Sequence, residues 1–267
     1  MTRRHFAQAS FGSGVGVWLS ARRNACAQNV ELNTAQPGAI KNVVLTHGAF
    51  ADGSSWSKVI PLLEAEGLNV SAVQNPLTSL ADDVATTRRL LAQQDGPTIL
   101  VGHSYAGFVI TEAGNAPNVA GLVYISSYGP DQGESHDDLV KRFPAPSGIS
   151  AIRLDADGFL WIARDKFHEA FVHEIDAADA RILATVQKPA SKKDCFGVPI
   201  IAPAWRSRPS WFLVSTEDRL ISPLLQRFMA KRMGATMKTV PSSHASLISH
   251  PTETANLILE AARRRQS

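Results

Sequence analysis

Short apolar runs alternate with amphipathic stretches along the chain from Ile40 onward. Six runs are rich in valine, isoleucine and leucine, as parallel strands covered on both faces are, and they span residues 41–47, 68–74, 97–103, 119–126, 209–215 and 236–241. Between them, polar caps and helical spacing predict helices, for example over 54–67 and 251–265. The alternation predicts an α/β fold with a mostly parallel, six-stranded sheet flanked by helices.

The alternation fails between about residues 131 and 205, where no run indicates a strand. Stretches 156–171 and 176–186 are predicted to be helical and carry bulky apolar residues, including Phe159 and Trp161. An excursion of this length is too long for a plain connection between two strands. We therefore expect a single domain over residues 28–267, with a helical cap inserted at about 131–205 over the carboxyl edge of the sheet.

The first 27 residues have the pattern of a targeting signal. Residues 2–6 form a twin-arginine pattern, a weakly apolar stretch follows, and residues 25–27 are small enough for cleavage before Gln28. We expect a signal peptide over 1–27 and a periplasmic or secreted mature protein; the alternative is a frayed N-terminal helix on a cytoplasmic protein. The apolar stretch is too short and too glycine-rich for a stable membrane anchor.

Charge gives no indication of a polyanionic partner. The chain has 27 Lys and Arg against 24 Asp and Glu, but four arginines and no acid lie within residues 1–27, which leaves 23 minus 24, or −1. Because residues 28–267 are so close to neutral, their charge predicts neither nucleic acid nor an anionic membrane as a partner. After cleavage Cys195 is the remaining cysteine, so an internal disulfide is not expected. Neither the composition nor the pattern of apolar residues indicates an oligomeric state.

A serine follows the third predicted strand within Gly102-His103-Ser104-Tyr105-Ala106-Gly107. A serine between small residues at a strand-to-helix turn is typical of a nucleophile elbow, in which the tight turn lifts the hydroxyl clear of the sheet. The usual pattern is G-x-S-x-G, and here Ala106 takes the last position, with glycine one residue later. The turn places the Tyr105 backbone N–H where it can stabilise an oxyanion. The alternative is a serine that merely caps the helix.

Two further strand ends supply the groups that a serine nucleophile needs. The fifth predicted strand leads to Glu217 and Asp218, and the sixth leads to His244, in the order serine, acid, histidine. Spacing alone leaves both acids open. His250 competes with His244 as the base, but it stands directly before a proline at the start of the next helix.

The first predicted strand ends in His47-Gly48-Ala49-Phe50, a tight turn whose Ala49 N–H can serve as a second oxyanion donor. We interpret His47 as a structural hydrogen-bonding residue. Candidates for an apolar substrate pocket are Phe50, Phe159 and Trp161.

No metal or organic cofactor is expected. His168 and His173 resemble a zinc-protease helix, but their spacing of five turns them about 140° apart at 3.6 residues per turn. The glycines at 12, 14 and 16 lack the preceding strand of a dinucleotide loop.

Four segments together resemble the α/β-hydrolase superfamily, and within it the small bacterial carboxylesterases that are similar to plant methylesterases and hydroxynitrile lyases: residues 47–56, 102–107, 216–218 and 243–244. The resemblance implies the α/β-hydrolase fold with Ser104, Asp218 and His244 as a triad. It also implies an oxyanion hole formed by the backbone N–H groups of Ala49 and Tyr105, and it favours Asp218 over its neighbour as the acid.

Departures from the pattern separate this chain from some of those relatives. The lyases carry a lysine directly after the triad histidine and a threonine after the first-loop histidine, where this chain has Ala245 and Gly48. Dehalogenases and epoxide hydrolases use an aspartate nucleophile in place of Ser104.

We therefore expect a serine hydrolase that cleaves carboxylic esters of small, partly apolar substrates through an acyl-enzyme intermediate. The alternatives are a cofactor-free perhydrolase or lactonase on the same triad, or a catalytically silent hydrolase fold that binds a small hydrophobic ligand.

Overall fold

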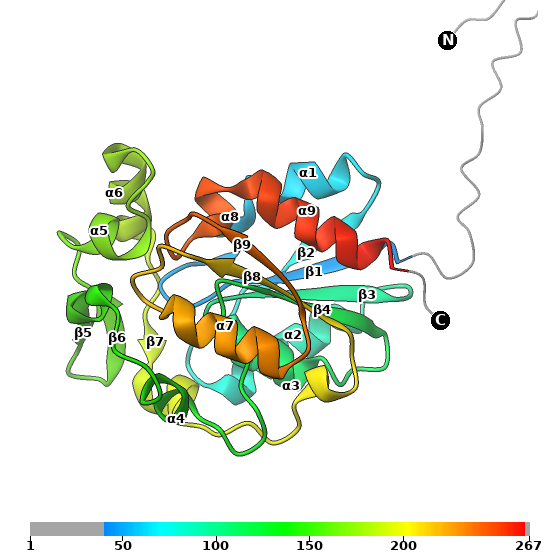
Figure 1. Ribbon diagram of the computed structural model, residues 1–267, viewed down its shortest axis with the longest axis horizontal. Coiled ribbons are helices and arrows are strands. Elements are labelled where there is room, and N and C mark those ends of the chain that lie inside the picture. Colours follow the sequence, from blue (N-terminus) through cyan, green and yellow to red (C-terminus); the bar gives the residue numbers. More distant parts are fainter. Residues whose placement is uncertain (1–39, 265–267) are drawn as a thin grey trace, which may run out of the picture. The chain divides into compact units, whose positions relative to one another are not determined.

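The computed structural model describes residues 40–264 of the chain, and a six-stranded sheet forms their centre (Figure 1). The strands lie in the order β2-β1-β3-β4-β8-β9 and every neighbouring pair is parallel. Their bounds are β1 Asn42–Thr46, β2 Asn69–Ala72, β3 Thr98–His103, β4 Val119–Ile125, β8 Ser210–Ser215 and β9 Thr236–Val240. Each lies within a run predicted to be a strand, which confirms the predicted sheet. The predicted signal segment, residues 1–27, lies outside the described residues.

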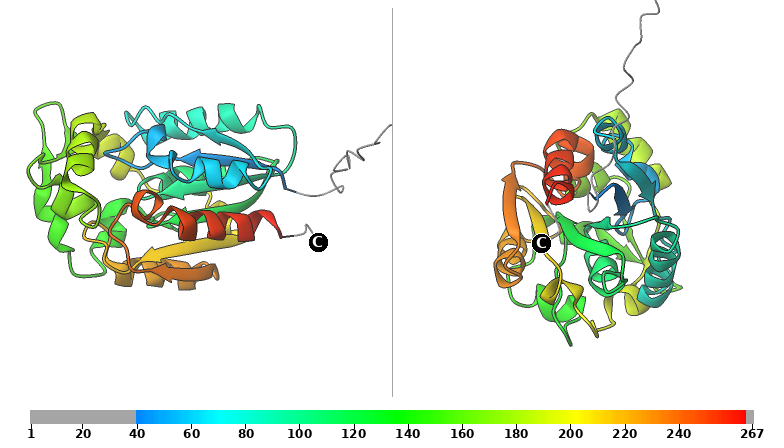
Figure 2. Two further views of the ribbon diagram at one scale, coloured as in Figure 1. Left: turned by 90° about the horizontal axis from the view of Figure 1, so that it is seen from above. Right: turned by 90° about the vertical axis from the view of Figure 1, so that its right-hand side faces the viewer.

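Helices cover both faces of this sheet (Figures 1 and 2). One face carries α1 (Ile60–Glu64), α8 (Ser246–Ser249) and α9 (Pro251–Ala262), and the other carries α2 (Leu80–Leu91), α3 (Ala106–Ala113) and α7 (Pro223–Arg232). The sequence fixes where several of them begin: the Ser79 side chain accepts a hydrogen bond from the Asp82 N–H at the start of α2, and a proline opens α9.

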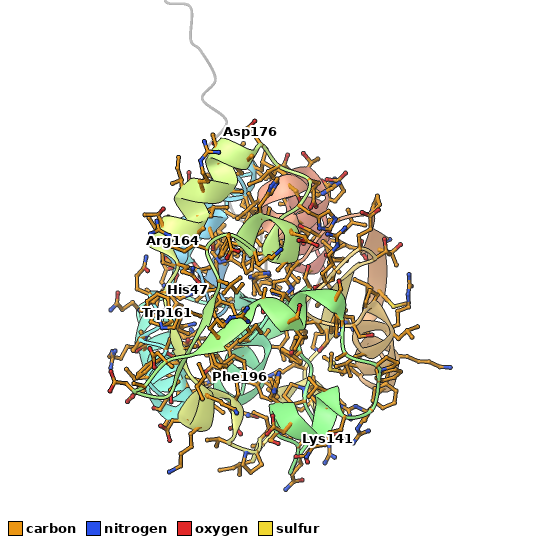
Figure 3. The ribbon with its side chains drawn as sticks, turned by 90° about the vertical axis from the view of Figure 1, so that its left-hand side faces the viewer. His47, Lys141, Trp161, Arg164, Asp176 and Phe196 are labelled. Atoms are coloured by element: carbon orange, nitrogen blue, oxygen red, sulfur yellow. The ribbon has the colours of Figure 1, made fainter. Side chains whose placement is uncertain are left out.

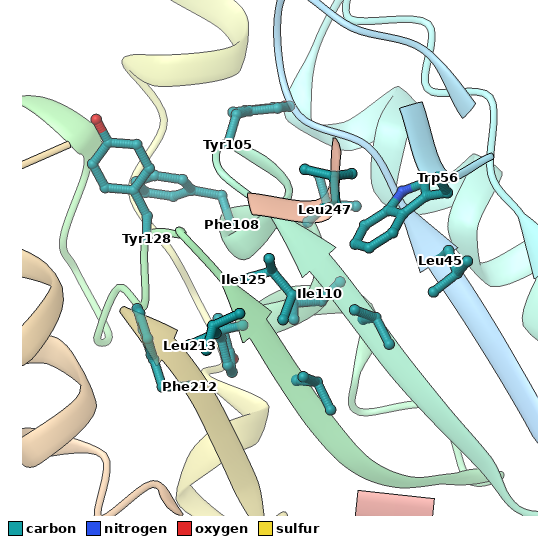
Figure 4. Packing of buried hydrophobic residues seen from close by; sticks show 14 of the residues in the cluster. Leu45, Trp56, Tyr105, Phe108, Ile110, Ile125, Tyr128, Phe212, Leu213 and Leu247 are labelled. Atoms are coloured by element: carbon teal, nitrogen blue, oxygen red, sulfur yellow. The ribbon is translucent and has the colours of Figure 1, made fainter. Parts of the chain in front are cut away.

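The apolar core lies between the sheet and these helices. Figure 4 shows side chains of the strands, such as Leu45, Ile125 and Leu213, among helix side chains such as Ile110 and Leu247. The strands β1 and β3 are buried along their whole length, because each is covered on both faces. Among residues 40–264, no helix has the length and apolar character needed to cross a membrane.

After β4 the chain forms a segment beyond the carboxyl ends of the main strands, which we call the insertion (residues 126–196), and residues 197–209 then lead back to the amino end of β8 (Figures 1 and 2). The insertion contains α5 (Phe167–Phe171) and α6 (Ala177–Val186), which lie within the two stretches predicted to be helical, and α4 (His136–Val140), which was not predicted. It also contains a small antiparallel sheet, β5 (Ile152–Leu154), β6 (Phe159–Ile162) and β7 (Ala190–Ser191), in the order β5-β6-β7.

The prediction of a helix over 156–171 is wrong over its first half, because a turn at residues 155–158 sends the chain back as a hairpin. The Asp155 carboxylate accepts hydrogen bonds from the N–H groups of Asp157 (3.0 Å) and Phe159 (2.8 Å). Gly158 has a φ of +85°, a conformation that glycine adopts freely. This turn chemistry, followed by a run of aromatic and β-branched residues, produces a strand.

Candidate active site

Ser104 stands in the sharp turn between β3 and α3. Its φ of +56° is left-handed, a conformation that costs energy for a residue other than glycine. The turn is held through the Ser104 carbonyl, which accepts hydrogen bonds from Ser127 Oγ (2.7 Å) and from the N–H groups of Gly107 (3.0 Å) and Tyr128 (3.2 Å). The loop after β4 therefore fixes the conformation of the serine.

Gly107 allows this loop to approach the turn. A Cβ at this position would lie 1.9 Å from the Tyr128 carbonyl oxygen and 2.4 Å from Ser127 Oγ. We expect Gly107→Ala to push the loop away from the turn and to lower the thermal unfolding midpoint by about 5 °C or more, the effect of overpacking by about 2 kcal/mol in a domain of this size.

The matched control for this prediction is Gly133→Ala, where an added Cβ meets nothing within 4 Å and the penalty comes from a φ of +79° alone. That penalty is about 1 kcal/mol. Scanning calorimetry measures both variants, and a midpoint for Gly107→Ala no lower than that of Gly133→Ala would contradict the steric argument.

The turn after β1 lies directly against the serine. A Cβ on Gly48 would be 2.8 Å from Ser104 Cβ and 2.9 Å from the His103 carbonyl oxygen, so this approach requires glycine. Ala49 follows in the same turn and borders the same cavity as Ser104. Within residues 40–264, the backbone N–H groups of Ala49 and Tyr105 donate to no protein acceptor. Both donors are therefore available to a ligand oxygen.

The structure brings Ser104, His244 and Asp218 into one hydrogen-bonded chain. His244 Nε2 lies 2.8 Å from Ser104 Oγ, and His244 Nδ1 lies 2.8 Å from Asp218 Oδ2. All three residues are buried. Because a carboxylate oxygen accepts and cannot donate, the imidazole proton belongs on Nδ1, which leaves Nε2 to accept the serine hydroxyl proton. This is the geometry that activates a serine as a nucleophile.

The Asp218 carboxylate is held by donors on both of its oxygens. Oδ1 accepts from the N–H groups of Leu220 (2.8 Å) and Ile221 (2.9 Å), and Oδ2 accepts from Gln226 Nε2 (2.7 Å) as well as from the histidine. Gln226 lies on α7, is buried, and uses its Oε1 to accept from the Ser215 N–H (3.1 Å). Gln226 was not predicted from the sequence. The one feature that could have indicated its role is a polar glutamine at a position of the helix that faces the core.

The competing acid and base lie elsewhere. The Glu217 side chain is 57% exposed and its Oε2 is 3.5 Å from His173 Nε2. The His250 ring lies 3.0 Å from Ser249 Oγ through Nδ1. Of the two adjacent acids that spacing left open, Asp218 contacts the histidine and Glu217 faces outward.

Two further histidines, both neutral, support the site. His47 Nδ1 donates to the Gly48 carbonyl (2.9 Å), and Nε2 accepts from the Asn75 N–H (2.9 Å). Burial lowers the pKa of His47 to about 4. His103 Nε2 donates to the His244 carbonyl (2.9 Å), and burial lowers the pKa of His103 well below its ordinary value. These contacts agree with the interpretation of His47 as a structural residue and show His103 holding the backbone of His244.

A cavity of about 320 Å³ opens onto Ser104 and His244. Its apolar wall comes from the turn after β1, the insertion and the end of the loop before α7: Ala49, Phe50, the ring of Tyr128, Ile149, Ile152, Leu160, Phe196, Leu220 and Ile221. Of the residues predicted for the substrate pocket, Phe50 borders the cavity.

Phe159 and Trp161 do not border this cavity, which corrects their assignment to the pocket. Both lie on strand β6, where successive side chains point to opposite faces, and Leu160 between them faces the cavity. The Trp161 Nε1 donates instead to Asp155 Oδ2 at 2.8 Å. Figure 3 looks onto the insertion and marks Trp161 and Phe196 there.

A larger hollow of about 680 Å³ lies at the amino ends of the strands, beside Pro97, Val119 and Pro209. None of its described lining residues is a histidine, cysteine or carboxylate, so it offers no comparable chemistry. The part of the chain that the structure describes contains no group of three or more histidine, cysteine or acidic side chains that could hold a metal ion.

Comparison with known proteins agrees with this geometry. The pattern of the Alpha/beta hydrolase family matches residues 43–257. Pyrethroid hydrolase of Sphingobium wenxiniae is 28% identical over 260 residues, covering 84% of this chain and 88% of that protein. Methylesterase 8 of Arabidopsis thaliana is 26% identical over 210 residues, covering 71% of this chain and 76% of that protein.

The fold also matches a solved structure. A crystal structure of a pyrethroid hydrolase superposes with a TM-score of 0.72 at 22% sequence identity, covering 85% of this chain and 99% of that chain. The family pattern extends from β1 into α9 and includes the serine, acid and histidine positions. The chain therefore belongs to the alpha/beta hydrolase family.

Proposed function

We propose that the protein is a serine hydrolase that cleaves carboxylic esters of small, partly apolar substrates through an acyl-enzyme. The observation that carries this proposal is the pair of 2.8 Å hydrogen bonds that link Asp218 through His244 to Ser104 at the wall of an apolar cavity. Relatives named as a pyrethroid hydrolase and a methylesterase support an ester as the substrate.

In the proposed mechanism, Ser104 Oγ attacks the ester carbonyl carbon while His244 Nε2 takes the hydroxyl proton. The Asp218 carboxylate holds the imidazole tautomer and stabilises the imidazolium, and the Ala49 and Tyr105 N–H groups bind the oxyanion. The tetrahedral intermediate collapses, and the leaving alkoxide takes the proton from His244. Water then attacks the acyl-enzyme with His244 as base, which releases the acid and regenerates Ser104.

Two measurements test this function. A fluorophosphonate should label one serine per molecule, located at Ser104 by peptide mapping, and a panel of p-nitrophenyl esters should be hydrolysed. A chain that binds apolar esters but is neither labelled nor active would be a silent binding protein and would contradict the proposal. If lactones are hydrolysed far faster than esters, the protein is a lactonase. If peracid forms from a carboxylic acid and peroxide far faster than esters are hydrolysed, it is a perhydrolase.

Gln226→Met provides a test of how Asp218 is held. The variant removes the donor to Oδ2, so more negative charge on that oxygen faces the imidazole and stabilises its protonated form. We expect kcat/KM to fall about tenfold, the equivalent of roughly 1.4 kcal/mol for one hydrogen bond, and the acidic limb of its pH profile to move to higher pH.

The matched control is Gln187→Met, because Gln187 is also buried but forms its hydrogen bonds with Ile162 and Ala184 in the insertion. The Gln187→Met variant should lower the stability of the fold without moving the acidic limb of the kcat/KM pH profile. Identical pH profiles for both variants would show that Gln226 acts on stability alone.

We also propose that residues 1–27 direct export by a twin-arginine route. The support is the sequence pattern around Arg3 and Arg4. The mass of the native protein should correspond to a chain that begins at Gln28, and replacing both arginines by lysine should retain the full-length chain in the cytoplasm. An unprocessed N-terminus in the native host would contradict this proposal.

A further inference from the structure

The cavity at Ser104 has a polar part that the proposed mechanism does not use. Besides Ser104 and His244, its polar lining residues are Tyr128, His136, Asp137 and Lys192. Most of the remaining wall is aliphatic or aromatic. A few polar groups in an apolar pocket are the usual means by which a site fixes the orientation of its ligand.

Tyr128 carries an unpaired hydroxyl into this cavity. Its ring packs against Phe108 at a centroid distance of 5.3 Å, and Figure 4 shows the hydroxyl pointing away from the core. Within residues 40–264, the hydroxyl has no hydrogen-bond partner. Burial, together with the charges of Asp218 and Asp137, raises the pKa of Tyr128, so the phenol keeps its proton and remains a donor. The hydroxyl is not one of the fully buried unpaired atoms, so it is open to the cavity and can donate to a bound polar group.

His136 presents an acceptor next to this donor. Its ring stands edge-on to Tyr128 (5.1 Å between centroids) and to Phe196 (5.0 Å). Nδ1 lies 3.2 Å from Asp137 Oδ1, and since a carboxylate only accepts, Nδ1 is the donor. Burial lowers the pKa of His136, so the ring is neutral and Nε2 keeps a free lone pair. Nε2 has no partner in the described part of the chain, and the side chain is 22% exposed.

A hydroxyl group matches this pair of side chains, because it can accept from the Tyr128 phenol and donate to His136 Nε2 at the same time. We propose that Tyr128 and His136 bind a hydroxyl of the substrate, so that the preferred substrates are compact esters with a hydroxyl in the acyl or alcohol part. This inference rests on the proposed ester hydrolysis and names its substrate class. A cavity of about 320 Å³ is small for a ligand site and suits such compact molecules.

Matched pairs of esters test the inference, for example methyl mandelate against methyl phenylacetate and methyl 3-hydroxybutanoate against methyl butanoate. The quantity measured is the ratio of kcat/KM for the hydroxylated ester to that for its deoxy partner, with both enantiomers assayed. The wild-type ratio should exceed that of Tyr128→Phe and of His136→Phe by about tenfold, the scale of one hydrogen bond in a dry site. His136→Gln, which restores an acceptor oxygen, should recover part of the ratio.

The ratio is insensitive to a general loss of folded enzyme, because both esters of a pair meet the same triad. His168→Phe is the matched control: His168 also lies in the insertion, but its Nε2 pairs with the Ile175 carbonyl (2.9 Å) and it does not border the cavity. This variant should keep the wild-type ratio.

Two outcomes would overturn the inference. One is an unchanged ratio in both Tyr128→Phe and His136→Phe. The other is a preference for esters with a free carboxylate, such as monomethyl succinate, that disappears in Lys192→Met, because the ammonium group at the cavity would then select the substrate. Hydrolysis of p-nitrophenyl acetate separates the two proposals: its absence defeats ester hydrolysis itself, whereas its presence with unchanged ratios defeats the hydroxyl site alone.

Discussion

Replacing Ser104 by alanine is expected to lower kcat for ester hydrolysis by roughly 10⁴-fold or more, the scale of nucleophile removal in other triads. The change deletes the oxygen that lies 2.8 Å from His244 Nε2, and with it the acyl-enzyme route. Alanine keeps the Cβ and fits the left-handed turn about as well as serine does, so the fold should persist. Steady-state kinetics on p-nitrophenyl butanoate, with circular dichroism as a check on folding, measures the effect.

Ser127→Ala is the matched control for this experiment. Ser127 Oγ donates to the Ser104 carbonyl (2.7 Å) and not to His244, so its loss weakens the turn without removing the nucleophile. Its kcat should remain within about tenfold of the parent, the scale of one hydrogen bond. Near-parental hydrolysis by Ser104→Ala would move the nucleophile to another residue.

The four central strands of the main sheet, β1, β3, β4 and β8, were predictable because they lie in a layer covered on both faces, whereas the edge strands β2 and β9 are partly or largely exposed. Strands β1 and β3 read as unbroken apolar runs for that reason, and turns and caps separate them from the helices. The insertion lacked such a signal. Phe159-Leu160-Trp161-Ile162 is a short apolar run, which periodicity cannot assign to a helix or a strand. It became a strand through the turn at Asp155 and through pairing with Ala190 and Ser191, which are distant in sequence.

The serine and the histidine were predictable for a related reason, since carboxyl ends of parallel strands meet at one edge of a sheet. The meeting of strand ends does not show which of two adjacent residues faces the site. Choosing Asp218 over Glu217 depends on which carboxylate turns inward, and choosing Leu160 over Phe159 depends on strand register. Gln226 forms no motif at all, because its role follows from how α7 packs beside the loop that carries Asp218.

Asp218→Asn should lower kcat/KM by roughly 10⁴-fold, because it reverses the imidazole tautomer. The two N–H groups of Leu220 and Ile221 hold an oxygen at the Oδ1 position, at 2.8 and 2.9 Å, and outweigh the single Gln226 donor at Oδ2. The new amide nitrogen therefore takes the place of Oδ2, which faces His244. An amide N–H donates, so the histidine Nδ1 must accept and its proton moves to Nε2. A protonated Nε2 cannot take the hydroxyl proton of the serine.

Glu217→Gln is the neighbouring control for this result, because it makes the same chemical change one residue earlier. The Glu217 side chain is 57% exposed and pairs with His173 rather than with His244, so kcat/KM should stay within about twofold, as for an exposed charge away from the reacting groups. Measuring both variants on one ester, with folding checked by circular dichroism, compares the two acids directly. A large loss in Glu217→Gln together with a small loss in Asp218→Asn would assign the acid to position 217, and would require the loop after β8 to rearrange before catalysis.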